Sequence, residues 1–495
     1  LTAQTATLNA ADTARFAHGS TITAVDTLTI NVDNVGVVDA DGGTVEARGS
    51  WDAATIAVNS FGDRDLIDLG PQRIDGDITV RMGGEEDRFI LTALNDRDPA
   101  DSFTVDGQGA ADEYKINRND APVSYVVDFA DSGAANDGAD ILTIDGRNTA
   151  DHVLVRKGFV ALLNTDGAGG YLNDVERINY GADMNGRIRI NGLGGDDRFF
   201  SDDTGTMFTL DGGAGDDTFQ IGQMFGAARV APNVATGDDI ETNETTQGFL
   251  SVGNSNPMLV YGGDGEDIFT VYSNKAMTKL FGEAGNDTFV VRAFVLKANP
   301  TTSAGGGDTE VFGGDGDDEI LYNMNAPLSI DGGSGVDTIV VIGTEVADNF
   351  LITEGGVYGA GLNIGFAGVE VAEIDGLEGD DTFFVTSTAA NMVVRIIGGL
   401  GSDTVNVAGD VTGQIVSYEV EGRSSVINHA VASDDPAYNE IFVDGLRANV
   451  ADGETALFEI DTTGLTLLDE GGAYGEYRIR MTKAITSTVF LTVSA

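Results

Sequence analysis

The sequence contains no cysteine, so neither disulfide bonds nor thiolate metal sites can stabilise this chain. Proline is also scarce, with 8 residues among 495, and aromatic residues make up only 7%. Hydrophobic residues still reach 41%, which is enough to build a packed core. The composition therefore argues against a chain that is disordered throughout.

Basic residues are scarce as well. The chain has 27 Lys and Arg against 80 Asp and Glu, for a formal net charge of −53. This balance excludes nucleic acids and anionic membranes as partners, because binding to phosphates requires Lys and Arg. It favours cations. A surface adapted for solubility or high salt is the alternative, and the placement of the acids has to decide between the two.

No run of 18 apolar residues occurs, so we expect no segment that spans a membrane. The three histidines, His18, His152 and His429, lie in unrelated contexts without metal-ligand spacing. Motifs of the G-x-S-x-G, H-E-x-x-H and P-loop types are absent, and acid pairs are too common to single out a catalytic pair. We therefore predict a protein that is not an enzyme. Because Leu1 begins directly in polar sequence, we also expect a segment of a longer protein.

Glycine, in contrast, is abundant at 68 residues, and much of it lies in one repeated phrase. The phrase is a short strand pattern, a glycine loop that ends in aspartate, and a second β-branched strand pattern. Examples are TLDGGAGDDTFQI (209–221), LVYGGDGEDIFTV (259–271), EVFGGDGDDEILY (310–322) and SIDGGSGVDTIVV (329–341). A strand and a turn take about 11 residues, so two such units form a coil of about 22 residues. The repeat predicts an all-β solenoid.

The chemistry of the loop points to calcium. We expect Gly212, Gly213 and Gly215 to adopt positive φ angles and expose carbonyl groups, and Asp217 to direct its carboxylate towards them. Calcium takes 6–8 oxygen ligands, more than one loop can supply, but a stacked loop about 4.8 Å away can complete the shell. An isolated Gly-Asp loop could be a simple turn, yet these loops recur in register.

The closing aspartates are separated by about one coil. The pairs Asp65/Asp87, Asp87/Asp112, Asp197/Asp217, Asp267/Asp287, Asp318/Asp337 and Asp381/Asp403 are 22, 25, 20, 20, 19 and 22 residues apart. We therefore predict calcium ligands at these closing aspartates, at the acids that precede four of them, and at the loop glycines. Besides the aspartates of the six pairs, the candidates are Asp196, Asp216, Asp317, Asp380, Gly213, Gly215, Gly263, Gly265, Gly314, Gly316, Gly333 and Gly335.

These loops resemble the G-G-x-G-x-D-x-U-x nonapeptide of RTX, or haemolysin-type, calcium-binding repeat proteins. GGAGDDTFQ (212–220), GGDGEDIFT (262–270), GGDGDDEIL (313–321), GGSGVDTIV (332–340) and GGLGSDTVN (398–406) match every fixed position, and the loops around Asp65, Asp87 and Asp112 are degenerate. The resemblance implies a right-handed parallel β-helix or β-roll with several Ca²⁺ ions between successive turns. Typical members repeat the loop every nine residues. Here it comes once per coil, so we expect the calcium loops on one edge.

Longer phrases are similar to those of very large bacterial surface or secreted proteins, and residues 470–495 resemble a Calx-beta-like sandwich module. The predicted organisation is a β segment at 1–50 and a degenerate β-solenoid at 51–221. An insertion with one short helix follows at 222–257, then an RTX-like solenoid at 258–413 and a small β-sandwich at 414–495.

The features together favour a calcium-stabilised extracellular structural protein, such as an adhesin stalk, an S-layer or a surface filament component. We expect it to fold on binding calcium, and to assemble with itself or with other cell-surface or matrix components. The absence of cysteine is compatible with a secreted bacterial protein. The alternative is a secreted β-helix protein that binds or modifies polysaccharides, in the manner of a lyase or epimerase.

Overall fold

The computed structural model describes residues 1–33, 42–70, 73–134, 137–168, 170–235, 237–304, 307–323, 328–418, 422–427, 446–451, 458–461 and 478–481. Every regular element in these ranges is a β-strand, which confirms the all-β class. No helix in the described ranges is long and apolar enough to cross a membrane. The chain forms two compact units, Leu1–Ile320 with Ala326–Asp337, and Leu321–Asn325 with Thr338–Ala495.

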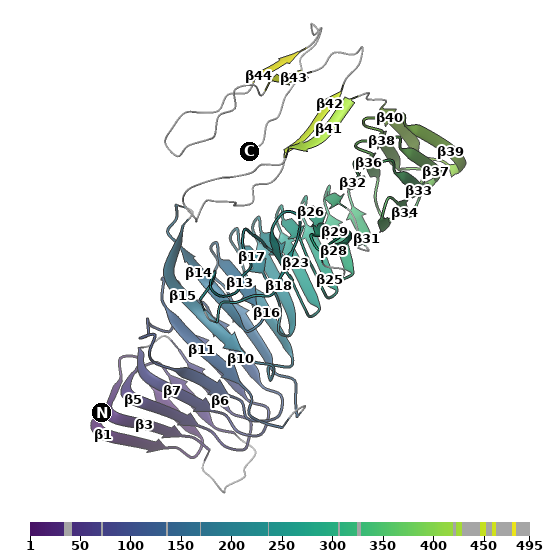
Figure 1. Ribbon diagram of the computed structural model, residues 1–495. Helices are drawn as coiled ribbons and strands as arrows, with labels where there is room; N and C mark the ends of the chain where they lie inside the picture. Colours follow the sequence, from purple (N-terminus) through teal and green to yellow (C-terminus); the bar gives the residue numbers. More distant parts are fainter. Residues whose placement is uncertain are drawn as a thin grey trace. The chain divides into compact units, whose positions relative to one another are not determined.

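In the first unit the chain alternates between two long parallel sheets, A and B (Figure 1). The strands of sheet A in this unit are β1 (Thr2–Asn9), β3 (Thr21–Asn31), β5 (Ser50–Asn59), β7 (Ile74–Arg81), β9 (Phe103–Asp106), β11 (Tyr125–Ala130), β13 (His152–Arg156), β14 (Phe159–Thr165), β15 (Tyr171–Tyr180), β17 (Arg198–Ser201), β19 (Thr218–Ile221), β24 (Ile268–Val271) and β26 (Thr288–Arg292). Only β14 is antiparallel to its neighbours.

Sheet B supplies the other half of each coil. Its strands in this unit are β2 (Thr13–Phe16), β4 (Thr44–Ala47), β6 (Leu66–Leu69), β8 (Arg88–Thr92), β10 (Glu113–Asn117), β12 (Ile141–Asp145), β16 (Arg187–Asn191), β18 (Met207–Ala214), β23 (Met258–Asp264), β25 (Thr278–Ala284), β29 (Thr309–Asp315) and β31 (Leu328–Ser334). Strand β30 (Glu319–Asn323) contains the division between the two units. Because β1 to β4 already belong to these sheets, the coils begin within residues 1–50.

The register places equivalent residues of successive coils side by side. Phe199 is paired with Phe219, and Phe219 with Phe269, and their rings stack with centroids 4.9 and 5.0 Å apart. Phe289 continues the stack at 4.7 Å. All four rings are buried, because alternate side chains of a strand point to one face and these point into the core.

Residues 222–257 lie between β19 and β23, where the sequence predicts an insertion. The predicted short helix is absent from the described part of this segment. It is replaced by a small antiparallel sheet of β20 (Met224–Phe225), β21 (Thr242–Glu244) and β22 (Phe249–Ser251). A hairpin of β27 (Phe294–Leu296) and β28 (Asn299–Ala304) forms a second insertion. Its Phe294 packs with Leu250 and Tyr272 in a separate apolar cluster.

The second unit has the same alternation. The strands β32 (Thr338–Ile342), β36 (Val371–Asp375), β38 (Val393–Ile397) and β40 (Gln414–Tyr418) pair in parallel. Strands β33 (Asn349–Thr353), β37 (Thr382–Thr388) and β39 (Thr404–Val411) do the same. A hairpin of β34 (Gly356–Gly359) and β35 (Leu362–Ala367) follows β33 in antiparallel order.

The predicted sandwich at 414–495 needs a correction at its start, because Gln414–Tyr418 extends the parallel sheet. Beyond it the described strands are two antiparallel pairs, β41 (Gly422–Ile427) with β42 (Leu446–Ala451) and β43 (Phe458–Asp461) with β44 (Arg478–Met481). Most of the predicted module, including the strands expected at 465–468 and 489–493, lies outside the described residues.

Candidate metal-binding loops

The closing aspartates form three columns in which each residue is bonded to its counterpart one coil away. Column I is Asp65, Asp87, Asp112 and Asp140; column II is Asp151, Asp197, Asp217, Asp267, Asp287, Asp318 and Asp337; column III, in the second unit, is Asp348, Asp381 and Asp403. In column II the backbone N–H of each aspartate donates to Oδ1 of the next, at 2.6–2.9 Å. Columns I and III repeat the pattern at 2.7–3.0 Å. All six pairs predicted from spacing are linked in this way.

Columns I and II lie on different edges of the first unit. Asp87 is in the connection from β7 of sheet A to β8 of sheet B, whereas Asp217 is in the connection from β18 of sheet B to β19 of sheet A. Since the chain alternates between the sheets, these two kinds of connection occur at opposite edges. The prediction of a single loop-bearing edge is therefore wrong for this unit. The change takes place across β12, which follows Asp140 and precedes Asp151.

The acids that precede the closing aspartates make a second ladder in the reverse direction. The backbone N–H of Asp216 donates to Oδ1 of Asp196 one coil earlier, at 3.2 Å, and Glu266 donates in the same way to Asp216 at 3.0 Å. Asp317 and Asp380 accept from the next coil at 2.8 and 2.9 Å. These four predicted residues are exposed. The steps 197/217, 217/267, 318/337 and 381/403 are thus each held by two hydrogen bonds of opposite direction.

The closing aspartates, in contrast, are buried. Those of the three columns are at most 6% exposed, except Asp403, which is half-buried at the last described loop. One oxygen accepts the ladder hydrogen bond. The Oδ2 atom has no hydrogen-bond partner in Asp87, Asp140, Asp197, Asp217, Asp267, Asp287, Asp318 and Asp381. A buried carboxylate oxygen without a partner is costly, so these atoms require a compensating group.

In the loops that end at Asp197, Asp217, Asp267, Asp287, Asp318 and Asp381, the first glycine makes room for that oxygen. A Cβ atom on Gly212 would overlap Oδ2 of Asp217, and the carbonyl oxygen of Gly262 in the next coil lies 2.7 Å from the same point. Gly262 has the same relation to Asp267 and to the carbonyl of Gly282, at 2.8 Å. A carboxylate oxygen and a carbonyl oxygen from adjacent coils therefore face one small space. A side chain at the position of the first glycine would fill this space.

The other loop glycines serve the backbone. Gly213, Gly215, Gly263, Gly265, Gly314, Gly316, Gly333 and Gly335 have φ angles between 100° and 145°. Gly212 does not have a positive φ angle. The prediction of positive φ angles at Gly212, Gly213 and Gly215 is therefore wrong for Gly212. In the loops that lack the second glycine, Leu193, Glu283 and Leu377 keep φ near 71–76°, which is strained for residues with a Cβ atom.

Burial raises the pKa of the closing aspartates. Loss of hydration is the largest cause, opposed by the ladder hydrogen bond and reinforced by neighbouring aspartates. It raises the pKa of Asp197 to about 8 and that of Asp267 and of Asp287 to about 7. The pKa of Asp217 and of Asp318 rises to about 6. A cation beside the columns would reverse this effect, because it stabilises the ionised form.

The available ligands suit calcium by type. Carboxylate and main-chain carbonyl oxygens are the donors that this hard cation takes. Within the described residues no group of three or more Asp, Glu, His or Cys side chains is placed to hold a metal. A metal at these loops therefore requires main-chain carbonyl ligands, and the oxygen pair beside each first glycine meets that requirement in part.

Three column members were missed in the sequence, namely Asp140, Asp151 and Asp348. Their loops lack the diagnostic glycines, as in GRNTAD (146–151) and GTEVAD (343–348). One signal was present, because each follows alanine and precedes an alternating strand, as in ADILTI, ADHVLV and ADNFLI. No protein-family model matches this chain, and no curated protein matches its sequence.

Proposed function

We propose that this protein is a calcium-stabilised, extracellular structural protein whose coils form a right-handed parallel β-helix with Ca²⁺ ions between successive loops. One observation carries the proposal. The buried closing aspartates recur once per coil, and six of them keep Oδ2 without a partner beside a carbonyl oxygen of the next coil, namely Asp197, Asp217, Asp267, Asp287, Asp318 and Asp381. A repeated carboxylate of this kind is costly in a metal-free fold and favourable around a cation.

The energy available is large enough to control folding. Extracellular calcium modules bind with a Kd of about 10⁻⁴ to 10⁻³ M. At roughly 1 mM calcium, a Kd near 10⁻⁴ M contributes about 1.4 kcal/mol per site, and several sites together approach the stability of an ordinary domain. The chain then stays unfolded at the low calcium level of the cytoplasm and folds outside the cell. A parallel β-helix that folds and assembles outside the cell suits a role as adhesin stalk, S-layer or surface filament.

Circular dichroism and thermal unfolding over a calcium titration test the proposal. We expect the β-signal and the Tm to rise with calcium and to fall in excess EGTA, with magnesium much less effective. Electron microscopy with and without calcium tests assembly, for which we expect ordered sheets or filaments that dissolve in chelator. A fully folded chain with the same Tm in EGTA and in calcium would contradict the proposal.

Polysaccharide binding is a second candidate, which a row of exposed side chains in the second unit favours. Tyr358, Leu351 and Phe384 occupy paired positions on neighbouring strands and are 36%, 40% and 42% exposed. Exposed aromatic rings in a row offer flat apolar surface for the faces of sugar rings. Affinity electrophoresis in polysaccharide gels tests this role. Retardation that Phe384→Ala abolishes would support it, and unchanged mobility would exclude it for the glycans used.

A further inference from the structure

The first aspartate of column II differs from those that follow. Both carboxylate oxygens of Asp151 have partners. Oδ1 accepts from Nη1 of Arg118 at 2.5 Å and from Nε of Arg147 at 2.7 Å, and Oδ2 accepts from the backbone N–H of Arg147 at 2.7 Å. In Asp197, Asp217 and Asp267 the Oδ2 atom has no partner. Arg118 and Arg147 thus satisfy a carboxylate that resembles, in position and burial, the candidate metal ligands.

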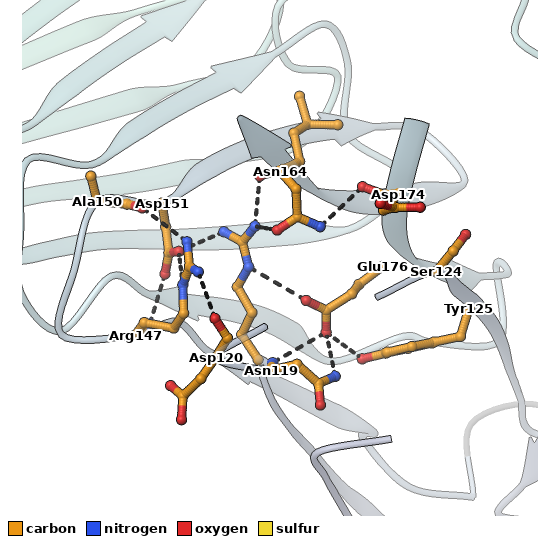
Figure 2. Close-up of polar contacts among 12 residues, drawn as sticks. Asn119, Asp120, Ser124, Tyr125, Arg147, Ala150, Asp151, Asn164, Asp174 and Glu176 are labelled. Carbon is orange, nitrogen blue, oxygen red and sulfur yellow. Dashed lines mark hydrogen bonds and ion pairs between the residues drawn. The ribbon is translucent and has the colours of Figure 1, made fainter. Parts of the chain in front are cut away.

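Arg118 is fixed in this position by a closed set of contacts, and Figure 2 labels its partners Asp151, Asn164 and Glu176. Its side chain is fully buried, and it lies 3.5 Å from Glu176 in addition to its ion pair with Asp151. Nη2 donates to the carbonyl of Leu163 at 2.6 Å and to the side chain of Asn164 at 3.0 Å. Glu176 is held in turn by Tyr125 at 2.9 Å and Asn119 at 3.0 Å. Two guanidinium groups therefore balance two buried carboxylates.

The place of Arg118 in the coil explains this role. It directly follows β10, which pairs with β12, and its backbone N–H donates to the carbonyl of Asp145 at 2.8 Å. Arg118 therefore lies one coil before residues 146–151, on the same edge. At every later step of column II a closing aspartate of the preceding coil donates its N–H to Oδ1. Arg118 supplies that hydrogen bond with its side chain, and it also supplies positive charge.

We propose that Arg118 and Arg147 take the place of a metal ion at the first loop of column II, so that residues 146–151 bind no calcium and the adjoining coils keep their fold without it. The inference rests on the proposed function for the remaining loops. Two guanidinium groups repel a divalent cation, and they occupy both oxygens that would bind it. The network creates a calcium-independent segment, residues 141–191 from β12 to β16, which lies between the candidate ligands Asp140 and Asp197.

Native mass spectrometry of the full chain in calcium tests the first half of this proposal. Arg118→Gln combined with Arg147→Gln leaves Asp151 and Glu176 without counter-charges, and we expect it to bind one more Ca²⁺ than the wild type. Arg156→Gln is the matched control, since Arg156 forms an ion pair with buried Asp202 at 2.8 Å, and neither residue belongs to a candidate metal-binding loop. It is expected to gain no ion. A folded double variant with unchanged stoichiometry would overturn the proposal.

Hydrogen exchange of the wild type in EGTA tests the second half and remains decisive if the double variant does not fold. We expect amides of β12, β13 and β16 to exchange at least tenfold more slowly than those of β24 and β26. Equal exchange would overturn the proposal. A wild type that binds no calcium, beside a double variant that binds one ion, would refute the proposed function while supporting this inference.

Discussion

At the scale of the residue, each closing aspartate uses its two oxygens differently. In Asp267, Oδ1 accepts a hydrogen bond from the backbone N–H of Asp217 at 2.7 Å, while Oδ2 lies against the first glycine of its own loop. The ladder bond fixes the rotamer of the carboxylate, and the glycine provides the space. Neither function depends on the other, so they can be tested separately.

Replacing the first glycine should remove the space. Gly262→Ala places a methyl group where Oδ2 of Asp267 lies, and we expect it to lower the free energy of unfolding by about 2 kcal/mol or more. Urea denaturation in 1 mM calcium measures the loss. Gly84→Ala is the control, since no atom lies within 4 Å of its Cβ position. Equal stability of the two variants would show that Oδ2 is not held there.

At the scale of the element, a loop and its neighbour one coil away act as one unit. Asp267→Asn keeps an acceptor for the ladder bond but removes a buried charge, and its amide can donate to the carbonyl of Gly282. We expect a higher Tm than the wild type in EGTA at pH 8, and a loss of about 1.4 kcal/mol in 1 mM calcium. Differential scanning calorimetry in both buffers measures the change of sign.

The exposed Asp264→Asn, in the same loop, is the control for charge alone. It should leave the difference between the two buffers unchanged. If Asp267→Asn lowers the Tm in both buffers by the same amount, the carboxylate is a structural group only.

The columns also predict how metal-free stability depends on pH. The pKa of Asp217 is raised to about 6, that of Asp287 to about 7 and that of Asp197 to about 8, chiefly by burial. A raised pKa means that the fold prefers the protonated form. Its stabilising contribution is complete below about pH 4 and is lost as the pH rises through 6 to 8.

In EGTA we therefore expect the Tm at pH 5 to exceed that at pH 8 by more than about 5 °C. Calcium should reverse the trend, because it binds the ionised carboxylates. Thermal melts followed by circular dichroism over this range provide the check. A Tm in EGTA that does not fall between pH 5 and pH 8 would contradict the burial of ionisable aspartates.

The strand order and the period were predictable from sequence, because Gly-Asp loops repeat near the length of two strands and two turns. The shift of the closing aspartates from one edge of the first unit to the other was not predictable. It requires a half-coil step, and Asp140 and Asp151 are only 11 residues apart. Asp140, Asp151 and Asp348 lie in loops without the glycine signature. The role of Arg118 was equally hidden, because its partners Asp151 and Glu176 are 33 and 58 residues away in sequence.

At the scale of the molecule, the insertions lie on the edge without the loops. In the region of column II, residues 222–257 and 293–308 both connect sheet A to sheet B, whereas the loops connect B to A. The ladder is unaffected by them. The step from Asp217 to Asp267 spans 50 residues and measures 2.7 Å, the same as the step of 20 residues from Asp197 to Asp217.

Shortening an insertion should therefore leave calcium binding intact. In the test variant, the dipeptide Asn-Gly replaces residues 226–248, so that β20 and β22 form a two-residue hairpin. We expect this variant to bind the same number of calcium ions as the wild type. Native mass spectrometry gives the count. A matched chain with the 20 residues 258–277 deleted removes one complete coil and should lose ions. Loss of ions from the first variant as well would show that the insertion supports the loops.

The two opposed ladders also have a mechanical consequence. In the steps from Asp197 to Asp217 and from Asp217 to Asp267, two separate hydrogen bonds join the same two coils. Bonds that join two coils in parallel share the tension when the coils are pulled apart. The loop edge therefore acts as a tie against stretching at these steps.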